Sequence, residues 1–115
     1  MARTIKVAAA QTGPVLTEDM APGVEVACRM VRDAAEQGAE IICFSELFLT
    51  PFFPNQLRQD YEHFFLKLPS PVTDPLFETA RRAGYRGAFV WSVLADDDQS
   101  AYPDEFVTWG AQLRA

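Results

Sequence analysis

The sequence predicts an α/β fold that begins with a strand, a helix and a second strand. Two short apolar runs, over residues 4–11 and about 40–45, are rich in small or β-forming side chains and are typical of buried strands. Between them, apolar residues recur at helical spacing over about residues 22–37. A strand, a helix and a strand in this order form a βαβ unit, whose strands are parallel and whose crossover is right-handed.

The first helix has start and stop signals at both ends. Thr17 or Asp19 can cap its N-terminus, and Pro22 suits its first turn. Gly38 stands just past the last apolar residue of the pattern, where a residue in the left-handed conformation commonly ends a helix. These signals bound the helix on both sides and leave short connections to the two strands.

The second half of the chain predicts two further helices and a hairpin. Residues 56–67 carry leucine and aromatic side chains at helical spacing, and residues 75–83 form a shorter pattern that Gly84 ends. Residues 87–94 are a good third strand, and residues 106–109 can return antiparallel to it. We therefore expect βαβ units with two or three parallel strands, followed by a C-terminal β-hairpin.

Composition and charge exclude several classes of function. The chain has 115 residues, 49% of them hydrophobic, which is enough for one domain with one core. Its net charge of -6 argues against nucleic acid or an anionic membrane surface as a partner. No apolar run approaches the roughly 20 residues of a membrane-spanning helix, and the N-terminus lacks signal-peptide features. We therefore expect a cytoplasmic protein, in which Cys28 and Cys43 pack as small apolar residues without a disulfide.

Glu46 is the strongest candidate for a chemical role. It ends the second predicted strand, and functional groups of α/β folds gather where strands pass into loops. Phe48, Phe52 and Phe53 follow it, so the carboxylate is expected in a partly apolar pocket that suits a general base. The alternative is a solvated glutamate, or one that pairs with a helix terminus, and position alone does not decide between them.

Metal binding finds little support in the sequence. His63 is the only histidine, and no second histidine stands near it, so a surface position on a helix is the better interpretation. Three aspartates follow one another at residues 96–98, without the spacing of an EF-hand loop. We expect a solvated hairpin tip there, and neither a metal nor a cofactor.

Several stretches, in order along the chain, together carry a resemblance to a known family. The strongest is Phe44, Ser45, Glu46 and Leu47, and the others are residues 5–11, 34–39, 50–54, 68–71 and 75–77. The set resembles the nitrilase, or carbon–nitrogen hydrolase, superfamily. Its last three stretches are similar to one branch, the N-carbamoyl-amino-acid amidohydrolases. The resemblance is strong over residues 4–84 and looser over residues 85–109.

The resemblance implies an αββα sandwich and a Glu–Lys–Cys catalytic triad. In such enzymes a cysteine thiolate attacks a carbonyl or nitrile carbon, and water later hydrolyses the intermediate. A thiol needs a base to become a nucleophile, and the developing oxyanion needs a cationic or N–H donor. Carried onto this chain, Glu46 is the general base, and no cofactor is needed. Weaker candidates for the wall of the substrate pocket follow it: Phe48, Thr50, Phe53 and Asn55.

The lysine and the nucleophilic cysteine of the family do not match any position of this chain. Lys6 starts the first strand and Lys67 ends the aromatic segment, whereas Cys28 and Cys43 lie in a helix and a strand. We therefore expect residues 1–115 to be one incomplete domain, the N-terminal part of a nitrilase-like sandwich. The isolated chain is expected to be inactive towards the small amides or N-carbamoyl amino acids that the resemblance implies as substrates.

Two other interpretations remain open at this point. A truncated, non-catalytic module could act by association, since half a sandwich exposes a sheet face and a strand edge. For this reason we expect a homo-oligomer. A small α/β domain with an unrelated role and a chance motif is the least favoured reading, because several separated segments match in order.

Overall fold

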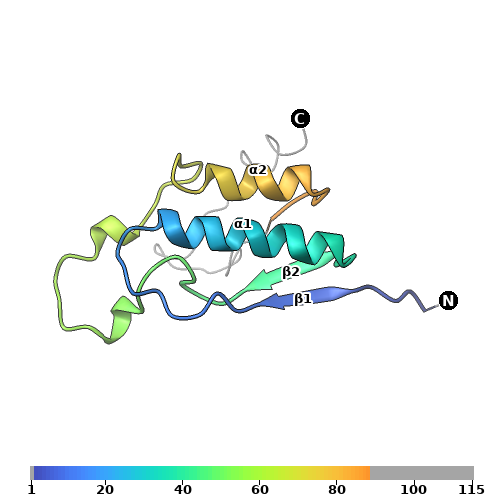
Figure 1. Cartoon of the computed structure of the whole chain (residues 1–115). Coiled ribbons are helices and arrows are strands. Elements are labelled where there is room, and N and C mark those ends of the chain that lie inside the picture. Colours follow the sequence, from blue (N-terminus) through green and yellow to red (C-terminus); the bar gives the residue numbers. More distant parts are fainter. Residues whose placement is uncertain (1, 89–115) are drawn as a thin grey trace.

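The computed structural model describes residues 2–88, which form a two-stranded parallel sheet with two helices (Figure 1). The predicted hairpin, and all but the start of the predicted third strand, lie outside these residues. No helix in the described part is long and apolar enough to cross a membrane. The elements, in order, are β1 (Val7–Ala10), α1 (Ala21–Glu36), β2 (Ile41–Phe44), the short 3-10 turns η1 (Phe53–Asn55) and η2 (Glu62–Phe64), and α2 (Asp74–Arg82).

The two strands pair in parallel, which confirms the predicted βαβ unit. The register runs from Val7 opposite Ile41 to Ala10 opposite Phe44, and both strands are shorter than the apolar runs suggested. Because side chains alternate along a strand, one face of the sheet carries Ala10 and Phe44 and packs towards α1. The fold class is therefore α/β, as expected for the N-terminal part of a nitrilase-like fold.

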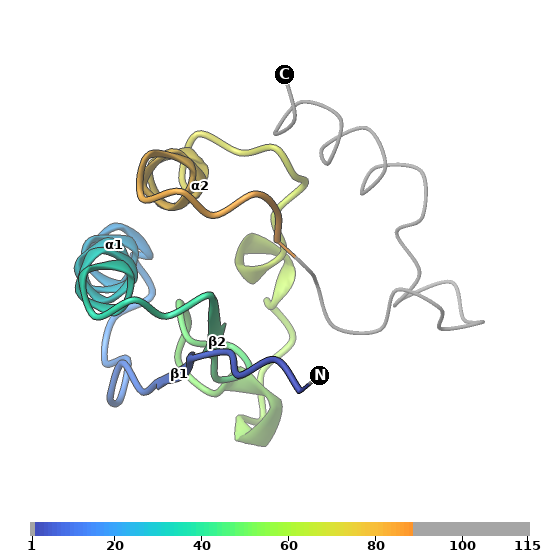
Figure 2. The same ribbon diagram turned by 90° about the vertical axis from the view of Figure 1, so that its right-hand side faces the viewer.

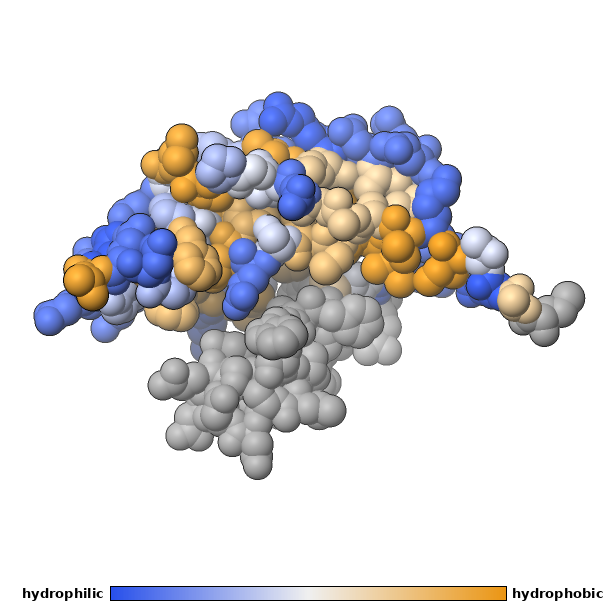
Figure 3. All heavy atoms as spheres, turned by 90° about the horizontal axis from the view of Figure 1, so that it is seen from below, coloured by the Kyte–Doolittle hydropathy of each residue, from blue (hydrophilic) through white to orange (hydrophobic). Residues whose placement is uncertain are grey.

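The other face of the sheet is exposed and apolar in the described part of the chain. Val7 and Ile41 are 62% and 51% exposed, and they are register partners on this face. Figure 3 views the molecule from the side of the sheet and shows apolar side chains gathered there. Cys43 also lies on this face and is exposed, so the expectation that it packs as a small apolar residue is wrong. A sheet buries apolar side chains only where another layer covers them.

The core forms between α1, the inner face of the sheet and α2. Val24, Ala27, Cys28 and Val31 recur along one side of α1 and are buried, and Leu76 of α2 packs among them. Figures 1 and 2 show α1 and α2 running side by side, with the sheet next to α1. The predicted first helix is confirmed almost to the residue, because a continuous apolar stripe specified it.

The N-cap residue of α1 is Met20, which makes no side-chain capping bond, so neither Thr17 nor Asp19 is the N-cap residue. Asp19 accepts a hydrogen bond on Oδ1 from the N–H of Ala21 at 3.0 Å, which serves one of the free donors of the first turn. At the other end, Gly38 has a φ of 79° and donates its N–H to the carbonyl oxygen of Ala35 at 2.9 Å. A glycine adopts this left-handed conformation without the steric cost of a Cβ, and the chain then turns directly into β2.

The predicted helix over residues 56–67 is wrong. The segment forms an irregular loop, in which the ring of Phe53 stacks on that of Phe64 with centroids 4.8 Å apart. Phe53 also contacts the rings of Tyr61 and Phe65, each at 5.8 Å between centroids. Phe53 lies outside the segment whose periodicity indicated a helix. Packing with a residue from elsewhere in the chain therefore overrode the local pattern.

Helix α2 is confirmed, with Gly84 at a φ of 96° just past its end. Its N-cap residue is Thr73, but the Thr73 hydroxyl donates to the carbonyl oxygen of Ser70 at 3.3 Å and caps no helix amide. After the helix, the hydroxyl of Tyr85 donates to the carbonyl oxygen of Ala39 at 3.0 Å. This bond fastens the segment after α2 to the residues just before β2, across the core.

Candidate active site

A shallow hollow lies at the carboxyl ends of the two strands. It is lined by Gln11, Thr12, Gly13 and Ser45. Because Ala10 and Phe44 are the last register pair, Gln11 and Ser45 leave the sheet next to each other. Ligands of parallel sheets bind at this edge, outside the carboxyl ends of the strands. The hollow therefore stands where a substrate site is expected, with polar groups around it.

Glu46 follows Ser45 directly and opens the turn that leaves β2. The next residue, Leu47, has a φ of 55°, a left-handed conformation that is uncommon for a residue with a side chain of this size. The N–H of Thr50 donates to the carbonyl oxygen of Leu47 at 3.2 Å and closes the turn. Backbone strain of this kind persists where the surrounding structure holds it, and it clusters at functional sites.

The turn after Glu46 is seated against the first turn of α1. A Cβ built on Gly23 would lie 3.3 Å from Leu49 Cδ2 and 3.6 Å from Leu49 Cα. The absence of a side chain at Gly23 thus lets the backbone of the turn approach the helix closely. The turn that begins at Glu46 thus follows β2 directly and contacts α1 at Leu49.

The apolar enclosure that the sequence predicts around Glu46 does not form among residues 2–88. The side chain of Glu46 is exposed. The ring of Phe48 stacks on that of Phe44 at 4.5 Å between centroids and packs against the core beneath α1. Phe52 is 58% exposed, and Phe53 belongs to the aromatic cluster of the loop. The rings of Phe48, Phe52 and Phe53 therefore lie in three different environments, because the chain changes direction at the turn and again at η1.

The remaining candidates for the pocket wall have different environments. Thr50 is 7% exposed, and its hydroxyl oxygen has no hydrogen-bond partner within residues 2–88. Asn55 is exposed at the end of η1. The structure thus separates Phe48, which faces the core, from Phe53, which lies in the loop. The hollow itself is lined by none of the four predicted wall residues.

Sequence reasoning missed Gln11, Thr12 and Ser45. None of these polar residues stands out when each strand is considered alone. The predicted βαβ unit could have pointed to them, because parallel strands bring their carboxyl ends to the same edge of the sheet. The residue that follows the first strand was therefore as good a candidate as the residues that follow the second.

Neither cysteine nor Lys6 takes a catalytic arrangement in the described part. Lys6 Nζ donates to the carbonyl oxygen of Gln37 at 2.7 Å, just past the C-terminal end of α1, where cations are favoured. Cys28 is buried on the core side of α1, and Cys43 lies on the exposed face of the sheet. Residues 2–88 also contain no group of three side chains that could hold a metal ion.

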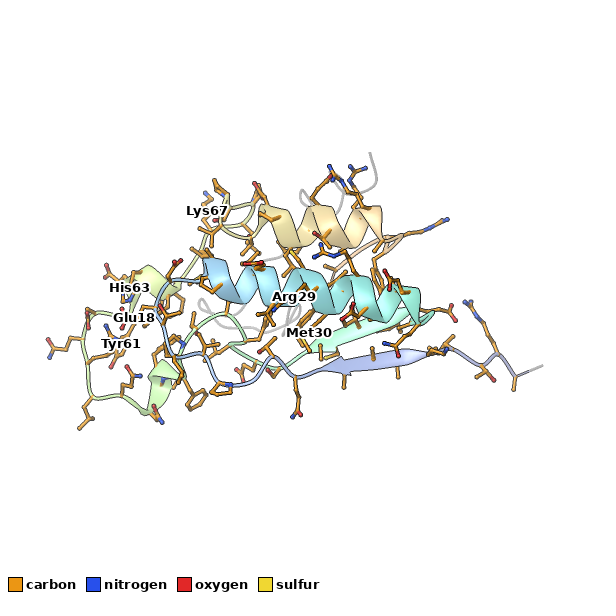
Figure 4. All side chains as sticks on the ribbon, viewed as in Figure 1. Glu18, Arg29, Met30, Tyr61, His63 and Lys67 are labelled. Carbon is orange, nitrogen blue, oxygen red and sulfur yellow. The ribbon has the colours of Figure 1, made fainter. Side chains whose placement is uncertain are left out.

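A cluster of charged side chains lies beside the N-terminal end of α1 (Figure 4). Arg58 donates to both carboxylate oxygens of Asp60, each at 2.9 Å, and to Glu18 Oε1 at 2.5 Å. His63 Nε2 lies 3.0 Å from Glu18 Oε2. The hydrogen bonds from Arg58 lower the pKa of Asp60 to about 2 and are the main reason that the pKa of Glu18 is lowered. Both carboxylates therefore stay charged at neutral pH.

Comparison with known proteins identifies a family. Residues 6–101 match the family model described as carbon-nitrogen hydrolase. Over 91 residues the chain is 35% identical to a cyanide hydratase of Armillaria gallica, an alignment that covers 70% of this chain and 25% of that protein. The chain thus spans about a quarter of the length of this relative. No solved structure matches the chain.

Proposed function

Because the chain belongs to the carbon–nitrogen hydrolase family, we propose that it is the N-terminal part of an enzyme that cleaves a non-peptide carbon–nitrogen bond, with Glu46 as general base. One observation carries the proposal. Glu46 follows β2 at the carboxyl edge of two parallel strands, next to Ser45, which lines the hollow together with Gln11, Thr12 and Gly13. An exposed carboxylate at this edge can accept the proton of a nucleophile that another part of the enzyme supplies.

The proposed mechanism divides the work between this segment and the rest of the enzyme. Glu46 takes the proton from a cysteine thiol, and the thiolate then attacks the substrate carbon. A lysine stabilises the negative charge on the substrate oxygen, and Glu46 returns its proton to the ammonia or amine that leaves. Glu46 then takes a proton from the water that hydrolyses the thioester and releases the product. Both the lysine and the cysteine are proposed to lie outside this chain. N-carbamoyl amino acids and linear amides are the proposed substrates. Cyanide is a further candidate because a relative is a cyanide hydratase, and water would be added to cyanide without cleavage of its carbon–nitrogen bond.

The experiment that tests this proposal compares the 115-residue chain alone with the same chain extended by the polypeptide encoded downstream. We expect the chain alone to give no turnover, and the extended protein to release ammonia from an N-carbamoyl amino acid or an amide. Loss of cyanide is followed in parallel, because it separates the two substrate classes. Turnover by the chain alone would contradict the division of the triad, and an inactive, folded extended protein would contradict the enzymatic assignment.

A second candidate function is a non-catalytic module that associates with another copy of itself. The observation that favours it is the exposed apolar face of the sheet, where Val7 and Ile41 meet solvent. Replacing Val7 with lysine places a charge on this face, and a charge opposes burial against a partner. If the face mediates association, Val7→Lys should shift the protein towards monomer in light scattering at matched concentration.

The matched control for that experiment is Leu57→Lys, because Leu57 is fully exposed on the loop and far from the sheet in sequence. It adds the same charge without altering the apolar face. An unchanged molar mass in both variants would exclude the sheet face as the association surface. Association of the folded chain through this face would support the module, and a monomer at all concentrations would count against it.

A further inference from the structure

The segment over residues 51–68 connects the turn that carries Glu46 with the approach to α2. In Figure 1 it extends beyond the carboxyl ends of β1 and β2, beside the N-terminal end of α1. Its regular structure is limited to η1 and η2, which are three residues each. Loops with so few backbone hydrogen bonds are the parts of a protein that open first. What fastens this loop therefore decides how freely it moves.

Glu18 fastens the loop from outside it. Each of its carboxylate oxygens contacts a different loop residue: Oε1 accepts from Arg58 Nη1 at 2.5 Å, and Oε2 lies 3.0 Å from His63 Nε2. The two loop residues flank the segment that passes through Tyr61, whose ring packs on Phe53. Figure 4 shows Glu18 and His63 next to each other, with Tyr61 nearby. One carboxylate thus bridges two points of the loop to the entry of α1.

The surroundings of His63 are charged on both sides. Glu18 contacts the imidazole of His63 from the segment before α1. Arg58 and Asp60 belong to the loop that carries His63. The ring of Phe64 lies against the imidazole at 4.0 Å between centroids. Glu62 is the neighbour of His63 in sequence and is exposed. A neutral imidazole keeps at most one hydrogen bond with Glu18, and a protonated one adds a charge–charge attraction to it.

We propose that Glu18, Arg58 and His63 form a clasp that holds residues 51–68 against the start of α1, and that the clasp tightens when His63 gains a proton. Protonation gives the imidazole a positive charge opposite the Glu18 carboxylate, which lies 3.0 Å away. Arg58 retains its charge throughout and supplies the permanent part of the contact. The proposal concerns the loop alone and holds whether or not the chain is part of an enzyme.

Hydrogen exchange of the loop amides measures the clasp directly. The reporters are the amides of Gln56, Phe64 and Phe65, which donate to Phe53, Tyr61 and Glu62 within η1 and η2. Exposed ion pairs are weak, so replacing Glu18 with glutamine is expected to speed exchange at these amides by about two- to five-fold at pH 6. Amides within α1 serve as an internal reference, because their exchange reports the core and not the loop.

Two variants separate the clasp from a general effect of charge. Glu62→Gln removes the same charge from the loop without touching the contact to Glu18, and it should leave exchange unchanged. His63→Gln keeps a polar side chain that cannot be protonated. The ratio of its exchange rate to that of the wild type should therefore exceed one at pH 6 and approach one at pH 8. Taking the ratio at each pH removes the intrinsic pH dependence of exchange.

Equal exchange in Glu18→Gln and Glu62→Gln would overturn the clasp. A ratio for His63→Gln that is the same at pH 6 and pH 8 would overturn its dependence on protonation. Circular dichroism of each variant verifies that α1 and α2 remain folded. If Glu18→Gln lowers the helical content, Arg58→Lys is measured in its place, since it keeps the charge but loses the forked geometry that contacts Glu18 and Asp60 together.

Discussion

Replacing Glu46 with glutamine is expected to lower turnover by roughly 10²–10⁴-fold in the protein that joins this chain to the proposed lysine and cysteine. Glutamine has nearly the same size and shape as glutamate, but it cannot accept the proton of a thiol or of a water molecule. Because the side chain of Glu46 is exposed, the exchange removes no packing and breaks no contact of the described core. The loss should therefore fall on kcat, with the melting temperature unchanged.

The control for this variant is Glu40→Gln, at the opposite end of β2. Glu40 is also exposed, and its carboxylate pairs with Arg3 at the amino edge of the sheet, away from the hollow. The Glu40→Gln variant loses one negative charge, as the Glu46→Gln variant does, and it should keep full turnover. Ammonia release at saturating substrate measures both variants. Turnover by Glu46→Gln equal to that of Glu40→Gln would show that the general base lies elsewhere.

Local patterns in the sequence were sufficient for the elements that pack against one continuous surface. Helix α1 has an uninterrupted apolar stripe and a glycine at its end, so its boundaries and its buried face followed from periodicity. The parallel pairing of β1 and β2 followed from the helix between them. Glu46 could be singled out for the same reason, because the end of a strand is visible in the sequence as the point where an apolar run stops.

The loop over residues 51–68 could not be predicted in this way. Its conformation depends on Phe53, which packs on Phe64 from outside the periodic segment, and on Glu18, which reaches it from before α1. Glu18 and Arg58 lie 40 residues apart in sequence, and Phe53 stands just before the periodic segment of residues 56–67, so the helical pattern contains neither Glu18 nor Phe53. The same limitation hid Gln11 and Ser45, which meet only because two strands end at one edge. Cys43 was expected to be buried, but it lies on the face of the sheet opposite α1.

The contribution of α1 to stability can be tested at Val31, which is 2% exposed and surrounded by core residues of α1 and α2. Replacing Val31 with aspartate places a carboxylate among the apolar side chains of this core. An uncompensated buried charge costs about 3–5 kcal/mol, which is a large share of the ~5–15 kcal/mol that stabilises an ordinary domain. We expect cooperative unfolding in urea at pH 7 to be lost or shifted to much lower urea.

Two further variants at the same position identify the cause of that loss. Val31→Ala removes apolar surface alone and should lower the free energy of unfolding by about 1.5–2.5 kcal/mol. Val31→Asn has the shape of the aspartate variant without its charge. Burial raises the pKa of an introduced carboxyl above its value in the unfolded chain, so its penalty is smallest below that unfolded value and grows as the pH rises. The difference in the free energy of unfolding between the aspartate and asparagine variants should therefore become smaller when the pH is lowered from 7 to 4. An aspartate variant as stable as Val31→Ala at pH 7 would show that α1 and α2 do not enclose this position.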